Sequence, residues 1–333
     1  MRAICLDQVG PPENLKLVDR DIPAVGDDDI LIRTELAGLI YADTEARRGT
    51  YYAKTEVPWY PGREVAGVVE KVGKNVASPR PGARVLALVL TGGCYAEYVL
   101  TSTRLHRFPG GTTAPAGEII ALPDHVTADQ ALPYAVNFRL AHVVVHAYSP
   151  AARAKRVIIH GASGGMGSMV TQVAHALGCE IFALCRNPAE AEFCRLNGAD
   201  HCIDTTQVDY VAEVQRLTGG AGAHISYNGV GGKTLDTDPH ALAPFGELIL
   251  YGYVAGKTMF NPFGFSKSLT FKTFSADDFV GAAPFAAATV AMNEWFMTKP
   301  LTSASRIFDL ADAPAAHRWI EEGRALGKIA LRP

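Results

Sequence analysis

The fold is decided by a stretch in the middle of the chain, Val157-Ile158-Ile159-His160-Gly161-Ala162-Ser163-Gly164-Gly165-Met166-Gly167. A short β-branched run leads into a cluster of glycines, the pattern of a buried strand that ends in a tight turn. Apolar residues then recur at helical spacing: Met166, Val170, Val173, Ala174 and Leu177. Strand, glycine turn and helix in this order typically bind a dinucleotide pyrophosphate, whose charge meets the N–H groups and the positive dipole end of the helix.

The spacing within the turn is A-x-G-x-x-G, with Ala162 where the dinucleotide fingerprint usually has its first glycine. Gly164 would let the backbone approach the phosphates, and Gly167 would let the helix pack closely on the strand. We therefore predict a cofactor-binding turn made of Ala162, Ser163, Gly164, Gly165, Met166 and Gly167.

The end of the next predicted strand, residues 180–185, indicates which dinucleotide binds. NAD-preferring sites place Asp or Glu there, about 20 residues past the glycines, to accept a hydrogen bond from the ribose 2′-hydroxyl. This chain has Arg186 instead. An arginine cannot accept a hydrogen bond, but its fork fits a 2′-phosphate in a bidentate manner. Arg186 therefore favours NADP(H), and the alternative is an ordinary exposed surface arginine.

Length and composition describe a folded protein with two domains. The chain has 333 residues, a length that usually divides into more than one domain. Of these residues 48% are hydrophobic and 20% are charged, as in an ordinary folded protein. A net charge of −3 gives no electrostatic reason to expect nucleic acid or a membrane as partner. No apolar run reaches the roughly 18 residues of a membrane span. The first residues follow a strand pattern without the apolar core of a signal peptide, so we expect a cytoplasmic protein.

The six cysteines form no C-x-x-C pair. They therefore indicate neither a zinc framework nor a redox dithiol, and we interpret them as small buried hydrophobic residues.

The chain is β-rich in its first part and alternates strands with helices from residue 156 onward. Strands are predicted over residues 30–33, 65–73, 84–89 and 95–99, and residues 107–117 read as a turn-rich loop. In the second part, strands ending near Asn228 and at Tyr251-Gly252 join the strand of the glycine turn. Alternation of this kind predicts a doubly wound parallel sheet whose ligand lies at the carboxyl ends of the strands. Asn228, Tyr251 and Gly252 are therefore further candidate cofactor-binding residues.

Several segments together resemble one family. They are Tyr60-Pro61-Gly62-Arg63-Glu64-Val65-Ala66-Gly67-Val68-Val69, Gly92-Gly93-Cys94-Tyr95-Ala96-Glu97-Tyr98, the glycine turn, Gly229-Val230-Gly231-Gly232 and Gly327-Lys328-Ile329-Ala330-Leu331. With them the chain resembles the medium-chain dehydrogenase/reductase superfamily, in its zinc-free quinone oxidoreductase (zeta-crystallin-like) branch, over nearly the whole length.

The resemblance implies an α/β fold with two domains. A GroES-like β-rich catalytic domain would be built from residues 1–125 and 270–333, around an inserted doubly wound (Rossmann) NADP-binding domain of residues 126–269. It also implies a cofactor contact from Lys328 and assembly as a homodimer.

The chain departs from the zinc-dependent members at their metal ligands. Where those enzymes have the His of a G-H-E motif, this chain has Arg63, and the segment Leu39-Ile40-Tyr41 offers no thiol at the place of the ligand cysteine. We therefore expect no metal site. Without a Lewis acid to hold an alkoxide, oxidation of simple alcohols is disfavoured.

Three residues are candidates for catalysis. Tyr41 lies in the expected active-site segment, and Tyr51 matches a tyrosine that the branch often places beside the substrate. A phenol can donate a hydrogen bond to an oxygen that gains negative charge. Asn137 matches a position that a related subgroup keeps near the nicotinamide. Packing, for the tyrosines, and a hydrogen bond within a helix, for Asn137, are the alternatives.

The predicted function is NADPH-dependent hydride transfer to a small molecule, either a quinone or the C=C bond of an α,β-unsaturated carbonyl, without zinc. One alternative is an enoyl or enone reductase that acts on a larger biosynthetic intermediate, with a pocket shaped by residues 107–117 and 260–265. The other is a cofactor-binding protein without turnover.

Overall fold

The computed structural model describes residues 1–107, 113–148, 156–256, 261, 265–299 and 301–333. They form two compact units, one of Met1–Val136 with Thr289–Pro333 and one of Asn137–Ala288. Compact units need not coincide with domains that fold independently, so the domain limits given above stay a prediction.

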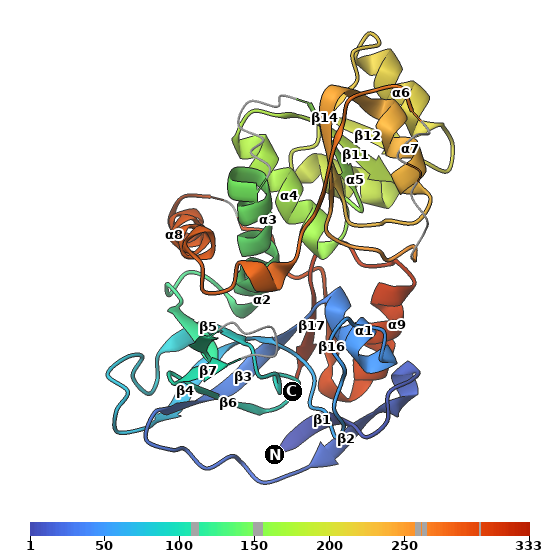
Figure 1. Ribbon diagram of the computed structural model, residues 1–333. Helices are drawn as coiled ribbons and strands as arrows, with labels where there is room; N and C mark the ends of the chain where they lie inside the picture. The colour runs from blue at the N-terminus through green and yellow to red at the C-terminus, as the bar shows by residue number, and fades with distance from the viewer. Residues whose placement is uncertain (108–112, 149–155, 257–260, 262–264, 300) are drawn as a thin grey trace. The chain divides into compact units, whose positions relative to one another are not determined.

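Among the described residues of the second unit, six parallel strands form one sheet in the order β12-β11-β10-β13-β14-β15 (Figure 1). The strands are β10 (Arg156–His160), β11 (Glu180–Cys185), β12 (His201–Asp204), β13 (Ala223–Asn228), β14 (Leu242–Leu250) and β15 (Thr270–Thr273). The chain runs outward from β10 to β12 and then resumes at β13 on the other side of β10. The predicted doubly wound sheet is confirmed, and its order reverses between β10 and β13.

Helices and short helical turns precede, connect and follow these strands. They are α3 (Arg139–Val143), α4 (Gly165–Ala176), α5 (Pro188–Leu196), α6 (Tyr210–Leu217) and α7 (Thr234–Ala241), with π-helical turns at Tyr134–Phe138 and Val144–Tyr148 and a 3₁₀ turn at Ala276–Asp278. Helix α4 packs on β10 and β11, and α6 lies beside α7. The predicted apolar face of α4 is buried at Val170, Val173 and Ala174.

Polar caps fix where two of these helices begin. The Asn187 side chain accepts a hydrogen bond from the N–H of Glu190 at 2.9 Å, and Pro188 occupies the first helical position of α5. The Asp209 carboxylate accepts from the N–H of Val211 at 2.9 Å and begins α6. Each cap satisfies an N–H group that the first helical turn leaves without a backbone partner.

The first unit is built on an antiparallel sheet. Its strands run in the order β16-β17-β3-β4-β5-β9, with β6 paired to β3 and a parallel contact only between β16 and β17. They are β3 (Asp29–Leu39), β4 (Glu64–Val72), β5 (Arg84–Val89), β6 (Tyr98–Ser102), β9 (Gly117–Ala121), β16 (Arg306–Asp309) and β17 (Ile329–Arg332). Two short ladders join β1 (Arg2–Leu6) to β2 (Leu15–Asp19) and β7 (Leu105–Arg107) to β8 (Thr113–Pro115).

Helices α1 (Tyr41–Arg48), α2 (Ala128–Pro133) and α9 (Ala313–Glu321) belong to the first unit, with 3₁₀ turns at Pro12–Asn14 and Leu310–Asp312. Helix α8 (Ala283–Thr298) runs from the second unit into the first. The core of the first unit gathers alternate residues of β3, β4 and β5 with apolar residues of α9. This alternation is why these strands were recognisable in the sequence.

Two predicted segments differ from the structure. The strand predicted over residues 95–99 begins only at Tyr98, because Tyr95 and Ala96 pair instead with β1: the N–H of Ile4 donates to the Tyr95 carbonyl at 2.8 Å, and Ala96 bridges to Ala3. The segment 107–117 is expected from the sequence to be turn-rich. Its first residue is the last residue of β7, residues 113–115 form β8, and Gly117 begins β9, while residues 108–112 lie outside the described residues. Most of the aromatic segment 260–265 also lies outside them.

The part of the chain that the structure describes contains no helix that is both long and apolar enough to cross a bilayer. The structure describes all six cysteines and places none of them in a disulfide; five are buried and Cys202 is half-buried.

The first unit buries a histidine that lacks hydrogen-bond partners. His317 of α9 is inaccessible to solvent, and neither ring nitrogen has a hydrogen-bond partner among the residues that the structure describes. Its ring meets Tyr95 edge-on, with the centroids 6.0 Å apart. Burial, aided by the nearby charge of Arg47, lowers the pKa of His317 from 6.5 to about 3. The folded protein therefore holds this ring neutral.

We predict that His317 makes the protein acid-sensitive. Below the ordinary pKa of about 6.5, the His317 ring binds a proton in the unfolded chain, whereas in the folded chain it stays unprotonated down to about pH 3. The free energy of unfolding should therefore fall by up to roughly 1 kcal/mol per pH unit between these values. His317→Leu should flatten this slope in urea unfolding between pH 7 and pH 4, whereas His240→Leu, at an exposed histidine, should not. Equal slopes in the wild type and His317→Leu would contradict the prediction.

Candidate functional site

The glycine turn lies at the carboxyl end of β10, where the order of the sheet reverses. Helix α4 begins at Gly165, and the residue before it, Gly164, has no side chain to cap the helix. A Cβ at position 167 would lie 2.1 Å from the carbonyl oxygen of Gly161, so only glycine allows α4 to approach the strand this closely. The N–H groups and positive dipole end of a twelve-residue helix are thus presented at the end of the central strand.

The other residues of the turn and Asn137 surround this helix terminus. Ala162 and Ser163 are buried, while Gly164, Gly165 and Met166 are partly exposed. Asn137 lies in the π-helical turn that precedes α3, and its side-chain amide is 3.4 Å from the point where a Cβ at Gly165 would be. The structure therefore brings Asn137 and the glycine turn together.

Arg186 follows directly after β11 and is held by a buried carboxylate. Its Nη2 donates to Glu190 Oε1 at 2.6 Å and its backbone N–H donates to Glu190 Oε2 at 2.8 Å. The side chain of Glu190 is 5% exposed, whereas that of Arg186 is 52% exposed. Glu190 thus fixes the orientation of a guanidinium that still faces solvent at the end of the second strand.

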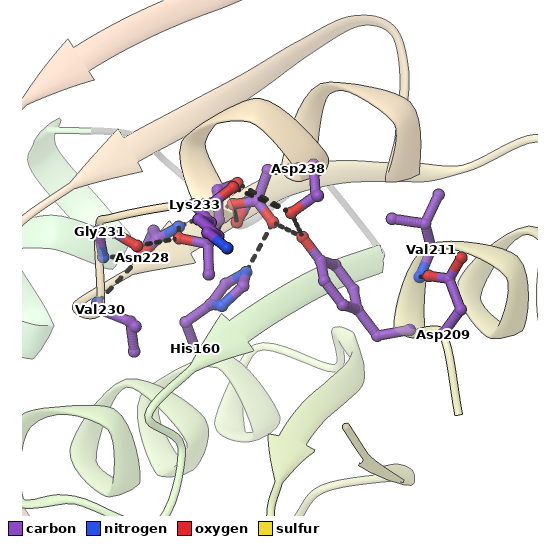
Figure 2. A network of polar contacts seen from close by, with 12 residues as sticks. His160, Asp209, Val211, Asn228, Val230, Gly231, Lys233 and Asp238 are labelled. Carbon is purple, nitrogen blue, oxygen red and sulfur yellow. Dashed lines mark hydrogen bonds and ion pairs between the residues drawn. The ribbon is translucent and has the colours of Figure 1, made fainter. Parts of the chain in front are cut away.

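Asn228 ends β13, and its amide is fully hydrogen-bonded. Its Oδ1 accepts from the N–H groups of Val230 and Gly231, both at 2.9 Å (Figure 2). Its Nδ2 donates to Thr234 Oγ1 at 2.8 Å and to Asp238 Oδ2 at 2.9 Å. Asn228 therefore shapes the turn after its strand from inside the protein, rather than from an exposed position.

Tyr251 and Gly252 follow β14 at the same end of the sheet. The Tyr251 hydroxyl lies 3.5 Å from the carbonyl oxygen of His160, and a Cβ at Gly229 would lie 2.5 Å from the Tyr251 ring. Burial raises the pKa of Tyr251, so the phenol stays protonated. The ring spans the ends of β10 and β13.

A dinucleotide fits this set of residues. The close approach at Gly167 places the first turn of α4 directly at the end of β10, the uncapped helix terminus favours an anion, and Arg186 offers a cation about one strand away. All of these groups lie at the carboxyl ends of neighbouring parallel strands, where ligands of doubly wound sheets bind.

The first unit gathers a second set of polar residues around Arg63. The Arg63 guanidinium carbon is 5.7 Å from the centre of the Tyr51 ring. Asp43, almost fully buried in α1, accepts from the Tyr95 hydroxyl at 3.0 Å and from the N–H of Ile40 at 3.1 Å. Burial raises the pKa of Asp43 to about 6, although the charge of Arg63 acts in the opposite direction. Arg63 is thus the cation of a buried polar cluster.

Tyr41 occupies the first position of α1 and is half-buried. The Arg48 Nη2 lies 3.4 Å from the Tyr41 hydroxyl, and the Arg48 guanidinium carbon lies 5.7 Å from the ring centre. Tyr41 and Tyr51 belong to the same unit, Tyr41 as the first residue of α1 and Tyr51 three residues after its end.

Lys328 is paired inside the first unit. Its Nζ donates to Glu64 Oε2, and both side chains are almost completely buried. Glu64 Oε1 also accepts from the N–H of Val136 at 3.0 Å. The Lys328 ammonium group therefore forms an ion pair with Glu64 in this structure. The contact of Lys328 with a cofactor stays a prediction.

Metal ligands do not gather in the described part of the chain: no group of three or more His, Cys, Asp or Glu side chains could hold an ion there. His142 and His146, one helical turn apart, stack with their ring centres 4.1 Å apart. Burial lowers the pKa of His142 to about 4.

Two functional candidates are absent from the predictions made from the sequence. Glu190 and Asp238 each share their helix with another acidic residue, Glu192 and Asp236 respectively, and no motif singles either of them out. Only the tertiary structure shows that they hold Arg186 and Asn228, respectively. The spacing of Arg186 and Glu190, four residues apart at a helix start, is the one local signal that could have been used.

Comparison with known proteins agrees with the geometry. Residues 26–128 match the family model of the alcohol dehydrogenase GroES-like domain, and residues 165–287 match that of the zinc-binding dehydrogenases. The quinone oxidoreductase of Rattus norvegicus is 31% identical over 264 residues, which is 79% of this chain and 76% of the rat protein.

Solved structures extend the similarity to the whole chain. The quinone oxidoreductase of Pseudomonas syringae pv. tomato DC3000 superposes with a TM-score of 0.87 at 26% identity, covering 100% of this chain and 99% of the other. A mycobacterial protein crystallised with NADPH superposes with a TM-score of 0.84 at 29% identity, covering 100% of both chains.

The fold and the site together define an oxidoreductase with a GroES-like and a Rossmann-type unit, as predicted. The chain belongs to the medium-chain dehydrogenase/reductase superfamily, in its quinone oxidoreductase branch.

Proposed function

We propose that the protein transfers hydride from NADPH to an electrophilic carbon of a small molecule, a quinone or an α,β-unsaturated carbonyl, without zinc. Two observations carry the proposal. In the second unit, the uncapped terminus of α4 and Arg186 lie at the carboxyl ends of neighbouring strands. In the first unit, Arg63 takes the place of the superfamily's zinc-ligand histidine. The names of the related quinone oxidoreductases and the NADPH bound to the mycobacterial structure support the proposal.

The bound dinucleotide would supply the hydride. The chain contributes binding and orientation: the terminus of α4 for the pyrophosphate, Arg186 for the 2′-phosphate and Asn137 beside Gly165 at the same end of the sheet. A protein that positions an already electrophilic acceptor in this way needs no group to abstract a proton from the substrate.

Negative charge arises on the acceptor oxygen when hydride reaches the carbon. Arg63 would stabilise this charge in place of a metal, because a guanidinium keeps its charge at all physiological pH values. The Tyr51 ring lies against Arg63, and Asp43 faces the same cation from α1. Tyr41 would donate a hydrogen bond or a proton to the oxygen. The expected homodimer and cytoplasmic location stay predictions.

The first test is a screen of acceptors. The purified protein should oxidise NADPH in the presence of quinones, enones or enals, and chelators should leave the rate unchanged, because the candidate residues require no metal. Turnover of simple alcohols with NADP⁺, or about one zinc ion per chain whose removal abolishes turnover, would contradict the proposal. Tight NADPH binding without turnover on any acceptor would favour a binding protein.

Arg186 should determine cofactor preference. We expect NADPH to bind at least about tenfold more tightly than NADH, since a charge-assisted bidentate contact can supply the ~1.4 kcal/mol that this ratio requires. Fluorescence titration should show the ratio lost in Arg186→Ala. Arg195→Ala removes a positive charge from α5, the helix that follows Arg186, where Arg195 pairs with Glu192 at 3.1 Å, and should leave the ratio intact. A ratio that survives in Arg186→Ala would contradict this role.

Tyr41 should assist turnover without being indispensable. Tyr41→Phe removes only the hydroxyl, and we expect kcat to fall on the order of 100-fold or less, because solvent can replace the proton. Tyr98→Phe, at another half-buried tyrosine of the same unit, is the matched control. An unchanged kcat would mean that Tyr41 only packs. Complete loss of turnover with NADPH affinity retained would mean an obligatory proton donor, as expected of an enone reductase.

A further inference from the structure

One buried carboxylate connects the ends of the two central strands of the second unit. Asp238 of α7 is inaccessible to solvent and accepts hydrogen bonds at both oxygens (Figure 2). Its Oδ1 is 2.6 Å from His160 Nε2 and 2.8 Å from the Tyr210 hydroxyl. Its Oδ2 is 2.7 Å from Ser226 Oγ and 2.9 Å from Asn228 Nδ2.

These four donors keep Asp238 charged despite its burial. Burial alone would raise the pKa of the carboxyl, but the charge and hydrogen bond of His160, with the hydroxyls of Ser226 and Tyr210, hold it below its ordinary value. A carboxylate has about four acceptor positions, and here each oxygen receives two donors. Each of these donors therefore lowers the free-energy cost of burying the charge inside the unit.

The strand register places two of the donors at the point where the sheet order reverses. His160 and Asn228 are direct partners in the parallel pairing of β10 with β13, and both are the last residues of their strands. His160 leads into the glycine turn at residues 161–167, and Asn228 leads into the second turn at residues 229–232. Asp238 thus holds the starting points of both turns at once.

The hydrogen bond from Asn228 to Asp238 fixes the orientation of the Asn228 amide, and this amide in turn bonds the backbone of the second turn. An amide has one accepting and one donating end. Because Asp238 can only accept, the Nδ2 of Asn228 must face it, and the Oδ1 must then face the N–H groups of Val230 and Gly231.

We propose that Asp238 is a positioning residue for the dinucleotide: through Asn228 and His160, its carboxylate fixes the two turns between which the cofactor binds. The inference rests on the proposed function. Asp238 acts through other residues and does not itself touch the cofactor, so its effect should be on the affinity for NADPH and NADH alike, and not on their ratio or on kcat at saturation.

The decisive experiment exchanges the carboxylate and the amide. Asn228→Asp alone places a second carboxylate against Asp238, and like charges at this distance cannot both be stable when buried. We expect the Kd of both cofactors to rise at least about tenfold, in line with coupling energies measured between neighbouring residues.

Addition of Asp238→Asn to this variant should restore binding. The carboxylate at position 228 would accept from the N–H groups of Val230 and Gly231. The Thr234 hydroxyl, which donates to the Gly231 carbonyl in the wild type, would have to rotate to donate to this carboxylate. The amide at position 238 would donate to the carboxylate while its oxygen accepts from His160 and Tyr210, and the Ser226 hydroxyl can rotate to suit. We expect the Kd of the double variant to lie within about threefold of the wild type, a recovery that only pairwise coupling produces.

Ser226→Ala is the matched control. It removes a donor from the same Asp238 oxygen that Asn228 uses but leaves the turn untouched. Its thermal midpoint should fall while the Kd of NADPH stays within about twofold of the wild type. If Asn228→Asp fails to fold, the double variant and the control carry the test.

Three results would overturn the proposal: an unchanged Kd in folded Asn228→Asp, a double variant that folds without recovering affinity, or a double variant that does not fold. The second would mean that Asn228 acts on the cofactor directly. If the wild type binds neither dinucleotide, the proposed function has failed. The thermal midpoints then still test whether Asp238 is coupled to the turn, since the double variant must recover what Asn228→Asp loses.

Discussion

The close approach of helix α4 to strand β10 is the constraint on which the second unit depends. With only 2.1 Å between the Gly161 carbonyl oxygen and a Cβ built at Gly167, any side chain at that position would push the helix away. Because glycine removes this obstacle, the first turn of α4 begins directly at the end of the strand. The uncapped helix terminus, which favours anions, is therefore placed where the sheet order reverses and where neighbouring strands also end.

The same end of the sheet is polar on the face that α6 and α7 cover. Further along this face the residues are apolar, as at Ile158, which is two residues before His160 and packs with Phe182 in the core. The apolar core at Ile158 and the polar network at His160 are therefore only two residues apart along β10. A buried carboxylate costs free energy unless it is fully hydrogen-bonded, so Asp238 is tolerated only because its donors converge on it from two strands and from α6.

Within the described part of the chain, the buried acidic residues of the first unit have fewer side-chain partners than Asp238. Two of this unit's buried acidic residues have one polar side-chain partner each, Glu64 with Lys328 and Asp43 with the Tyr95 hydroxyl, while Arg63 lies against an aromatic ring. A guanidinium is a fixed charge that is neither titrated nor exchanged, unlike a metal-bound water. A guanidinium can stabilise an oxyanion but cannot activate a poor electrophile as a Lewis acid does, and for this reason the proposed function names acceptors that are already electrophilic.

The sequence by itself determined the elements whose signals are local. The β-branched run at 157–160, the glycines after it and the helical spacing of Val170 and Val173 gave the strand, turn and helix, and the resemblance extended this to both units. Prediction from the sequence was wrong where pairing with a distant segment sets the structure: Tyr95 and Ala96 lie outside the predicted strand because they pair with β1. Glu190 beneath Arg186, and Asp238 between His160 and Asn228, were decided only by the tertiary structure. A hydrogen bond between side chains 78 residues apart depends on how helices pack on a sheet, and no local periodicity encodes that distance.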